Sequence, residues 1–232
     1  MDLVSWKESV MVHVAVSPSP VRATRSAWKL EGYEQTRLKK IAARCRGGSV
    51  LDIGYACKPN GHLRGLYRVG LDLSLPPVPS GYEEEIVGNA LDLGLSLDSR
   101  RFDTIVAGEL IEHLEDPYAF LRSLRAHLNE GGRVILSTPN PVAWPVVFFE
   151  WCGSRRFFYS YDHTYYFAPR WVRRILESTG FVLEEIAPVG LLLPLPGVTL
   201  PCPVGLSYQV IYVARPLATG SGTQVDHPNE DR

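Results

Sequence analysis

The stretch Val50-Leu51-Asp52-Ile53-Gly54 decides the fold that the sequence predicts. An apolar run that ends in glycine is typical of the first strand of a doubly wound α/β domain, where glycine lets the backbone approach a ligand. A loop reaching Asn60-Gly61 and then a helix are expected to follow, and a second run ends in Gly70-Leu71-Asp72-Leu73-Ser74. The carboxylate of Asp72 lies where it could accept hydrogen bonds from both hydroxyls of a ribose. These two strand ends therefore predict a site for a nucleoside-bearing ligand.

Short apolar runs alternate with helix-forming stretches along the rest of the chain. Seven runs read as strands, at residues 49–53, 67–73, 84–87, 102–107, 133–137, 182–188 and 208–214. The alternation indicates crossover connections and a mostly parallel sheet, in three layers α/β/α. One helix is expected to begin at Asp116-Pro117, to include Leu128 and to end at Gly131-Gly132. Another is expected to begin at Pro169 and to end before Gly180.

The chain of 232 residues predicts one domain with extensions at both ends. Residues 1–45 are expected to form an arm and a leading helix, and residues 46–215 the domain itself. The domain contains an insertion at 141–167 with eleven aromatic residues, and an apolar loop rich in leucine and proline at 190–206. The polar tail at 216–232 is expected to be disordered, since it has too little apolar surface to bury.

The overall charge argues against a nucleic-acid binder. Lysine and arginine number 24 against 25 acidic residues, so the net charge is −1. The four cysteines form no C-x-x-C pair and no secretory leader is recognisable, which favours reduced thiols and a cytoplasmic protein. No apolar run reaches the length needed to span a bilayer. Three functions are compatible with the apolar loop at 190–206: a wall of the acceptor pocket, a dimer contact or a contact with a membrane surface. The oligomeric state stays open.

The order of the motifs resembles that of the class I S-adenosylmethionine-dependent methyltransferases over roughly residues 46–190. The blocks that carry the resemblance are 50–54, 70–74, 88–93, 102–109, 112–117 and 128–140. The resemblance implies a seven-stranded Rossmann-like sheet whose last strand, at 208–214, is antiparallel. It also implies S-adenosylmethionine as cofactor and methyl transfer, most simply to oxygen of a small-molecule acceptor such as a sugar, lipid, quinone or secondary metabolite.

The resemblance assigns the cofactor site residue by residue. It implies Asp52, Gly54, Tyr55 and Gly61 around the methionine part, Asp72 with its neighbour Leu73 at the ribose, and Asn89 and Ala90 at the adenine. Two positions depart from the family pattern. Ala56 occupies the place of a second glycine, and Asn89 stands where aspartate is common, although an amide oxygen can still accept the adenine amino group. The missing G-x-G-x-x-G turn counts against a nicotinamide dehydrogenase.

Glu109 and His113 are the candidate catalytic residues, because they follow the fourth strand on the face where the ligand should lie. An imidazole there could remove the proton of an acceptor hydroxyl. Glu109, Glu112, His113 and the distant His163 could also hold a divalent cation such as Mg²⁺. This E-x-x-E-H pattern resembles small-RNA 2′-O-methyltransferases and, in part, polyprenyl-quinone O-methyltransferases. The same residues also occur in family members without a metal, where they cap a helix and line the pocket.

The aromatic insertion at 141–167 is expected to form a lid or an acceptor pocket. Its Arg155-Arg156 pair would either meet an anionic group of the acceptor or keep an apolar lid soluble. Two other functions stay open. A metal-assisted RNA 2′-O-methyltransferase would need a basic surface that the net charge does not supply. A non-catalytic interaction protein would retain the methyltransferase fold without its activity.

Overall fold

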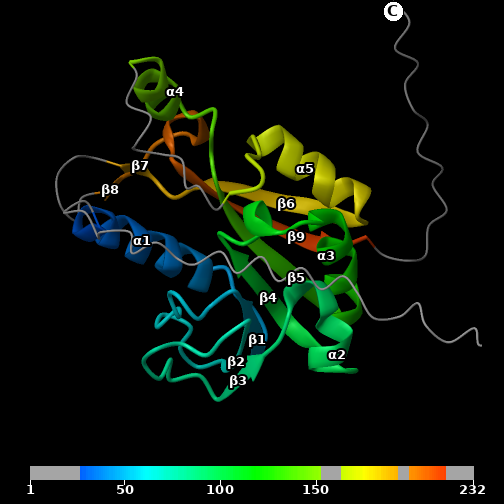
Figure 1. Cartoon of the computed structure of the whole chain (residues 1–232). Helices are drawn as coiled ribbons and strands as arrows, with labels where there is room; N and C mark the ends of the chain where they lie inside the picture. The colour runs from blue at the N-terminus through cyan, green and yellow to red at the C-terminus, as the bar shows by residue number, and fades with distance from the viewer. Residues whose placement is uncertain (1–26, 153–162, 193–198, 218–232) are drawn as a thin grey trace, which may run out of the picture.

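The computed structural model describes residues 27–152, 163–192 and 199–217, and its core is a single seven-stranded sheet (Figure 1). The strands lie in the order β3-β2-β1-β4-β5-β9-β6. Their bounds are β1 (Ser49–Ile53), β2 (Tyr67–Asp72), β3 (Glu84–Val87), β4 (Phe102–Gly108), β5 (Leu128–Pro139), β6 (Phe181–Pro188) and β9 (Gln209–Pro216). All neighbours pair in parallel except β9, which is antiparallel to both β5 and β6. The predicted sheet and its antiparallel last strand are confirmed.

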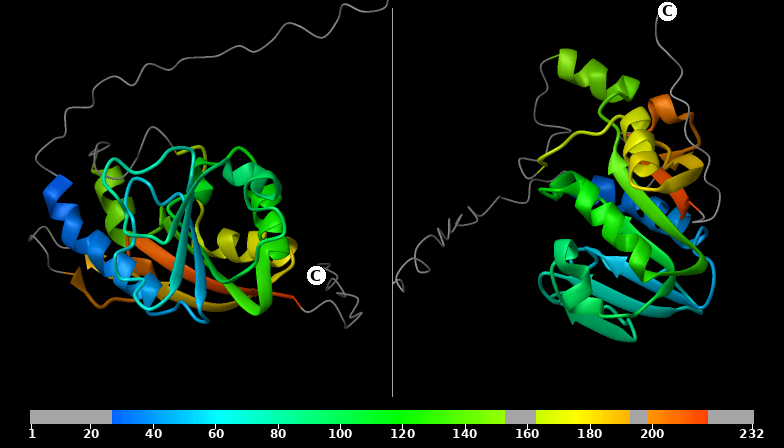
Figure 2. Two further views of the ribbon diagram at one scale, coloured as in Figure 1. Left: turned by 90° about the horizontal axis from the view of Figure 1, so that it is seen from below. Right: turned by 90° about the vertical axis from the view of Figure 1, so that its right-hand side faces the viewer.

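Helices cover both faces of this sheet, because successive residues of each strand point to opposite sides. Leu51 and Ile53 of β1 belong to the cluster that α2 (Leu93–Leu97), α3 (Pro117–Leu124) and α5 (Pro169–Ser178) bury. Val50 instead packs on the other face with Tyr33 and Ile41 of α1 (Ala27–Ala42). Figure 2 shows α1 and α3 on opposite sides of the strands. The predicted three-layer α/β/α sandwich is therefore confirmed, and Asp52 faces the α1 side.

The parallel pairing brings three strand ends to one edge of the sheet. Ile53 of β1 pairs with Leu71 of β2 and with Ala107 of β4, so these strands stop at the same level. The backbone N–H of Gly54 donates to the carbonyl of Leu71 at 2.9 Å, with a φ of 78° at Gly54. This left-handed conformation favours glycine and turns the chain sharply away from β1. The loop after β1 consequently lies directly above the end of β2.

Two expectations from the sequence were wrong in detail. The helix α3 ends at Leu124, followed by a 3₁₀ turn at Arg125–His127, and Leu128 already begins β5 by pairing with Phe102. Local apolar spacing could not show that this leucine pairs with a distant strand. The stretch 190–206 is not a plain loop, since it contains β7 (Leu191–Leu192), its antiparallel partner β8 (Thr199–Leu200) and the 3₁₀ turn η4 (Val204–Leu206).

The helix expected after Gly61 is also absent, since the stretch 54–66 between β1 and β2, which contains Pro59 and Gly65, forms turns. The other boundaries follow the sequence closely. The leading helix is α1, and the aromatic insertion contains α4 (Trp144–Trp151). The expected arm at 1–26, the middle of the insertion at 153–162 and the tail at 218–232 lie outside the described residues. In the described part of the chain, no helix has the length and apolar character that a bilayer crossing requires.

Candidate functional site

A cavity of about 210 Å³ lies between α1 and the ends of β1 and β4. It is lined by residues of α1, of the loop after β1 and of the end of β4: Glu34, Arg37, Leu38, Ile41, Asp52, Gly54, Tyr55, Cys57, Lys58, Asn60, Val106, Gly108 and Glu109. Four of the residues predicted from the sequence, Asp52, Gly54, Tyr55 and Glu109, are therefore in its wall. Gly61 is not among the lining residues, whereas its neighbour Asn60 is.

Asp52 lines the cavity and holds the loop after β1 in place through Tyr82. Its Oδ2 accepts a hydrogen bond of 2.6 Å from the hydroxyl of Tyr82. That hydroxyl in turn accepts from the backbone N–H of Asn60 at 2.7 Å. Burial raises the pKa of Asp52 to about 6, against the lowering effects of the Tyr82 bond and the Arg37 charge. The aspartate is thus a buried acid, held in place by a tyrosine that the sequence did not single out.

Tyr55 forms the wall between the cavity and β2. Its ring stacks on Tyr82 with centroids 5.2 Å apart. The ring also occupies the space above Gly70, where an ideal Cβ would lie 2.5 Å from the tyrosine ring. Glycine at position 70 is therefore needed for the tyrosine to fit. The ring of this side chain therefore packs against the sheet, while the residue also lines the cavity.

Asp72 lies at the end of β2 and binds the loop after β1. Its Oδ2 accepts from the backbone N–H of Ala56 at 2.8 Å, and its Oδ1 from the N–H of Leu73 at 2.7 Å. Ala56 stands at the position of the missing second glycine, and it makes this bond through a backbone group that any residue except proline supplies. Each carboxylate oxygen keeps a second lone pair. A ribose could therefore still bind to the same carboxylate.

The residues predicted at the adenine lie beyond the cavity, after β3. The Oδ1 atom of Asn89 accepts from the N–H of Leu91 at 2.9 Å and so caps the 3₁₀ turn at Ala90–Asp92. Ala90, the first residue of that turn, is buried, whereas the side chain of Leu73, directly after β2, is 73 % exposed. An exposed apolar side chain next to a strand end is available to cover a flat ring. Asn89 therefore has a local structural role, as the cap of this turn.

Sequence reasoning missed Arg37, a buried cation in the cavity wall. Its Nε and Nη2 atoms donate to Oε2 of Glu34 at 3.0 and 2.7 Å, and its Nη1 donates to the hydroxyl of Ser137 at 3.1 Å. Burial by itself lowers the pKa of Arg37, but the charges of Glu109 and Glu34 outweigh it and raise the pKa. The helix α1 offered only an amphipathic pattern, and nothing in that pattern distinguishes this arginine from a solvent-exposed one.

Glu109 directly follows β4 and has a strained backbone conformation. Its φ of 54° is uncommon for a residue other than glycine. Its carboxylate accepts from the hydroxyl of Ser137 at 2.9 Å and from Nε2 of Gln209 at 2.7 Å. Gln209 also donates to Glu34 at 3.1 Å and so connects both carboxylates that flank Arg37. Burial raises the pKa of Glu109, although the charge of Arg37 opposes it.

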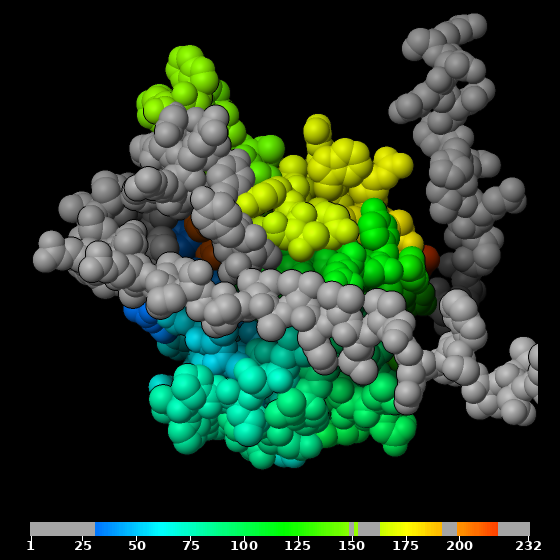
Figure 3. All heavy atoms as spheres, in the orientation of Figure 1, coloured from blue at the N-terminus to red at the C-terminus, as the bar shows by residue number. Residues whose placement is uncertain are grey.

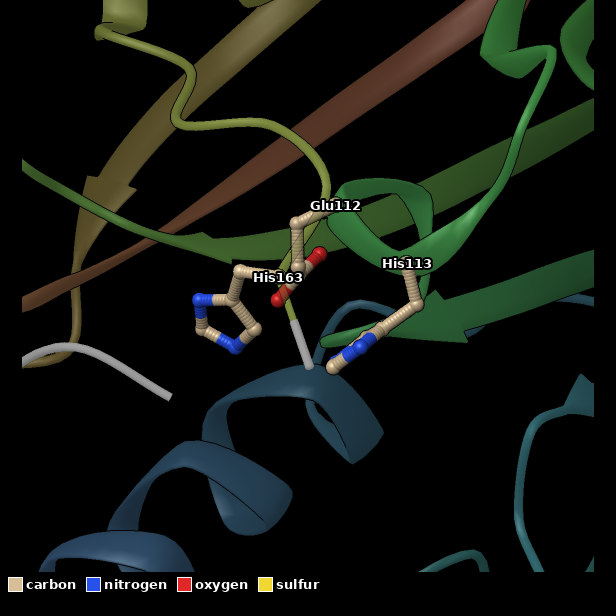
Figure 4. Close-up of side chains that lie close together, drawn as sticks. All are labelled: Glu112, His113 and His163. Atoms are coloured by element: carbon tan, nitrogen blue, oxygen red, sulfur yellow. The ribbon is translucent and has the colours of Figure 1, made fainter. Parts of the chain in front are cut away.

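Glu112, His113 and His163 form a second cluster next to the cavity (Figure 4). One ligand atom of each lies within 4.8 Å of the others, and the two imidazole rings are 4.7 Å apart. The carbonyl of Glu112 accepts from the N–H groups of Thr164 and Tyr165 at 2.8 and 3.1 Å, which fixes the segment carrying His163. Glu109 does not join this cluster. Three of the four residues predicted to hold a metal are therefore brought together.

The carboxylate of Glu112 is buried and has no hydrogen-bond partner among the described residues. Burial raises the pKa of Glu112 to about 9, and the charge of Glu109 adds to this effect. A buried carboxylate without a partner is unusual, because most buried polar atoms are hydrogen-bonded. His113 is exposed and His163 is half-buried, so the cluster is open on the side away from Glu112.

Comparison with known proteins gives the family. A family model described as a methyltransferase domain matches residues 29–186. A ubiquinone biosynthesis O-methyltransferase from Aeromonas salmonicida is 24% identical over 183 residues, which cover 74% of this chain and 73% of that protein. One from Xanthomonas euvesicatoria pv. vesicatoria is 26% identical over 172 residues, covering 67% of this chain and 69% of that protein. The chain belongs to the methyltransferase domain family.

Solved structures show the same fold. A 1,6-didemethyltoxoflavin-N1-methyltransferase from Burkholderia thailandensis, with bound S-adenosylhomocysteine, superposes with a TM-score of 0.56 at 15% identity, covering 80% of each chain. A SAM-dependent methyltransferase from Archaeoglobus fulgidus gives 0.55 at 16% identity, covering 78% of this chain and 92% of that one. The family and this fold make the protein an S-adenosylmethionine-dependent methyltransferase.

Proposed function

We propose that the protein transfers a methyl group from S-adenosylmethionine to a hydroxyl oxygen of a small-molecule acceptor. One observation carries this proposal: the end of β4 contributes to two adjoining sites. Gly108 and Glu109 line the cavity, while Glu112 and His113 form the cluster beside it. The likeness to the O-methyltransferases of ubiquinone biosynthesis supports transfer to oxygen.

The cavity is suited to the methionine part of the donor. Arg37 supplies a buried cation that can pair with the α-carboxylate, and charge-assisted bonds of this kind are the strong ones. Asp72 provides acceptors for the ribose hydroxyls, and the exposed side chain of Leu73 borders the adenine. The methyl group then points out of the cavity toward His113.

Methyl transfer is an in-line displacement, for which positioning supplies most of the rate. The acceptor oxygen attacks the methyl carbon, the carbon–sulfur bond breaks, and its electron pair stays on sulfur to give S-adenosylhomocysteine. The hydroxyl proton passes to the imidazole of His113, which acts as general base.

The residues of the second cluster fit a divalent cation. A buried carboxylate without a hydrogen-bond partner beside two imidazoles provides the oxygen and nitrogen ligands that such ions use. Glu112, His113 and His163 would hold the ion, which would lower the pKa of an acceptor hydroxyl when bound. We give this cation as the alternative to the general base, because a His113 nitrogen that holds the ion cannot also take the proton. Mg²⁺ is the first ion to test.

The test follows transfer of a tritiated methyl group from S-adenosylmethionine to a panel of phenols and catechols. Mass spectrometry and NMR then identify the methylated atom. We expect O-methyl products. His113→Ala should lower kcat by about 10²–10⁴ while S-adenosylhomocysteine affinity stays unchanged. Methylation of nitrogen or carbon alone would overturn the oxygen assignment, and an unaltered kcat in His113→Ala would remove the general base.

The cation is tested separately. Wild-type protein treated with EDTA should lose activity and regain it with Mg²⁺. Glu112→Gln should abolish Mg²⁺ binding measured by calorimetry. Glu115→Gln is the matched control, because this exposed carboxylate lies three residues further along the chain and outside the cluster. Full activity in EDTA would end the cation hypothesis and leave methyl transfer itself intact.

A further inference from the structure

Five polar side chains at the cavity are joined by a closed ring of hydrogen bonds. Arg37 of α1 donates to Glu34 of the same helix and to the hydroxyl of Ser137 on β5. That hydroxyl donates to Glu109. Gln209 at the start of β9 donates to Glu109 and to Glu34, which closes the ring. The result is a charged ring that connects α1 with β5, β9 and the residue after β4.

The charges within this charged ring do not cancel. It contains two carboxylates, Glu34 and Glu109, and one guanidinium, Arg37, so its formal charge is −1. Arg37 is 5% exposed, Gln209 4% and Ser137 0%, so water screens these charges poorly. One oxygen of Glu109 accepts from Ser137 and the other from Gln209, and such bonds favour the ionised carboxylate. The ring therefore places an excess negative charge in the wall of the cavity.

The other charged residues of the cavity wall do not compensate for this excess. Lys58 in the loop after β1 is paired with Glu31 of α1, which does not line the cavity. Asp52 adds a further buried carboxylate from β1. Figure 3 shows α1, in blue, directly against the loops beside the ends of β1 and β2, in cyan. Among the described residues that line this cavity, carboxylates thus outnumber cations by three to two.

We propose that the charged ring recognises the positive charge on the sulfur of the donor, with Glu109 as the residue that distinguishes S-adenosylmethionine from S-adenosylhomocysteine. The two compounds differ by one methyl group and by the charge on sulfur, which is positive in the donor and zero in the product. A carboxylate in a buried wall attracts a cation more strongly than a carboxylate in water does. Loss of the methyl group removes this attraction, so the product leaves more readily than the donor.

The placement of Glu109 fits this role. Glu109 lines the cavity and lies four residues before His113, on the side where the proposed function puts the reacting sulfur, and the inference rests on that placement. Arg37 remains able to bind the donor carboxylate. Its guanidinium has five N–H groups, and the bonds within the charged ring use three of them. Arg37 and Glu109 thus offer opposite charges to the two ends of the methionine part.

The experiment measures the dissociation constants of both compounds by calorimetry with the full chain. Glu109→Gln keeps the shape of the side chain and one acceptor oxygen, but it removes the charge. We expect this variant to bind S-adenosylmethionine about tenfold more weakly and S-adenosylhomocysteine as wild type does. The preference for donor over product should therefore fall about tenfold. Glu34→Gln removes the other carboxylate of the charged ring and should lower the same preference.

Two controls separate charge from structure. Ser137→Ala breaks the bond to Glu109 without changing any charge, so it should affect both compounds alike and keep the wild-type preference. Glu177→Gln removes an exposed carboxylate of α5, on the opposite face of the sheet from α1, and should also keep it. Circular dichroism establishes that each variant is folded.

The proposal is overturned if Glu109→Gln weakens both compounds by the same factor, which would give Glu109 a structural role only. A wild-type preference in both Glu109→Gln and Glu34→Gln would have the same consequence. So would a loss of preference in Ser137→Ala or Glu177→Gln as large as in Glu109→Gln. The identity of the methylated atom does not depend on this preference, so the oxygen assignment and the charged ring succeed or fail separately.

Discussion

Replacing Asp52 by asparagine should stabilise the folded protein at neutral pH. Burial raises the pKa of Asp52 to about 6, from 3.8 for an unperturbed side chain. The difference is worth about 3 kcal/mol, at about 1.4 kcal/mol for each pH unit. Asparagine keeps the shape and an oxygen that can accept from the hydroxyl of Tyr82, but it has no charge to bury.

The direction of this pH dependence of stability follows from proton binding. Because the folded protein holds the proton of Asp52 more tightly than the unfolded chain does, this group favours folding below about pH 4. Its contribution is lost as the pH rises through about 6. Asp52→Asn and wild type should therefore differ least below pH 4, and above pH 6 the variant should be more stable by about 3 kcal/mol.

The assay is urea unfolding of both proteins without cofactor, at intervals from pH 4 to pH 8. Asp103→Asn is the matched control, for which we expect the opposite change in stability. The bond from Asn129 and the N–H groups of Gly48 and Ser49 lower the pKa of Asp103, so its replacement should destabilise the protein at neutral pH. A stability difference between Asp52→Asn and wild type that stays constant between pH 4 and pH 7 would refute the reasoning. So would an Asp52→Asn variant that is less stable at pH 8.

Two further substitutions test the strand ends. Gly70→Ala should destabilise the protein by about 1–3 kcal/mol in the same unfolding assay, because the added Cβ would meet the ring of Tyr55. Gly94→Ala is the control: its added Cβ meets nothing within 4 Å, so this variant should be as stable as wild type or more stable. Equal effects of the two glycine substitutions would contradict the packing at β2. Asp72→Ala should weaken S-adenosylhomocysteine binding at least tenfold in calorimetry, since it removes both a ribose acceptor and the bond that holds Ala56. Unchanged affinity would remove Asp72 from the cofactor site.

The parts of the fold that depend on local sequence were predictable. Gly54 and Asp72 mark the ends of β1 and β2 in the sequence itself, and the alternation of elements determines that those ends meet. Leu128 was misplaced because its pairing with Phe102 depends on a strand 26 residues earlier. Helical spacing carries no information about such a partner.

The predicted site was incomplete for the same reason. Arg37 and Gln209 come from opposite ends of the chain and meet only when α1 and β9 pack around β4 and β5. No spacing rule connects positions so far apart. The sequence also could not show that the ring of Tyr55 packs over Gly70, because this contact depends on the empty space above a glycine of another strand.

Three features of the candidate site reduce the stability of the folded protein, and this loss argues for a functional role. Asp52 is an acid whose burial raises its pKa, Glu109 has a left-handed backbone, and Glu112 has no hydrogen-bond partner among the described residues. Each feature opposes folding, and backbone strain of this kind alone costs about 1–3 kcal/mol. Asp52 lies near the end of β1, and Glu109 and Glu112 follow β4, at the same edge of the sheet. Strained and perturbed groups gather where a ligand later interacts with them. We therefore infer that these residues mark the ligand site, where a bound ligand would supply the partner that the carboxylate of Glu112 lacks among the described residues.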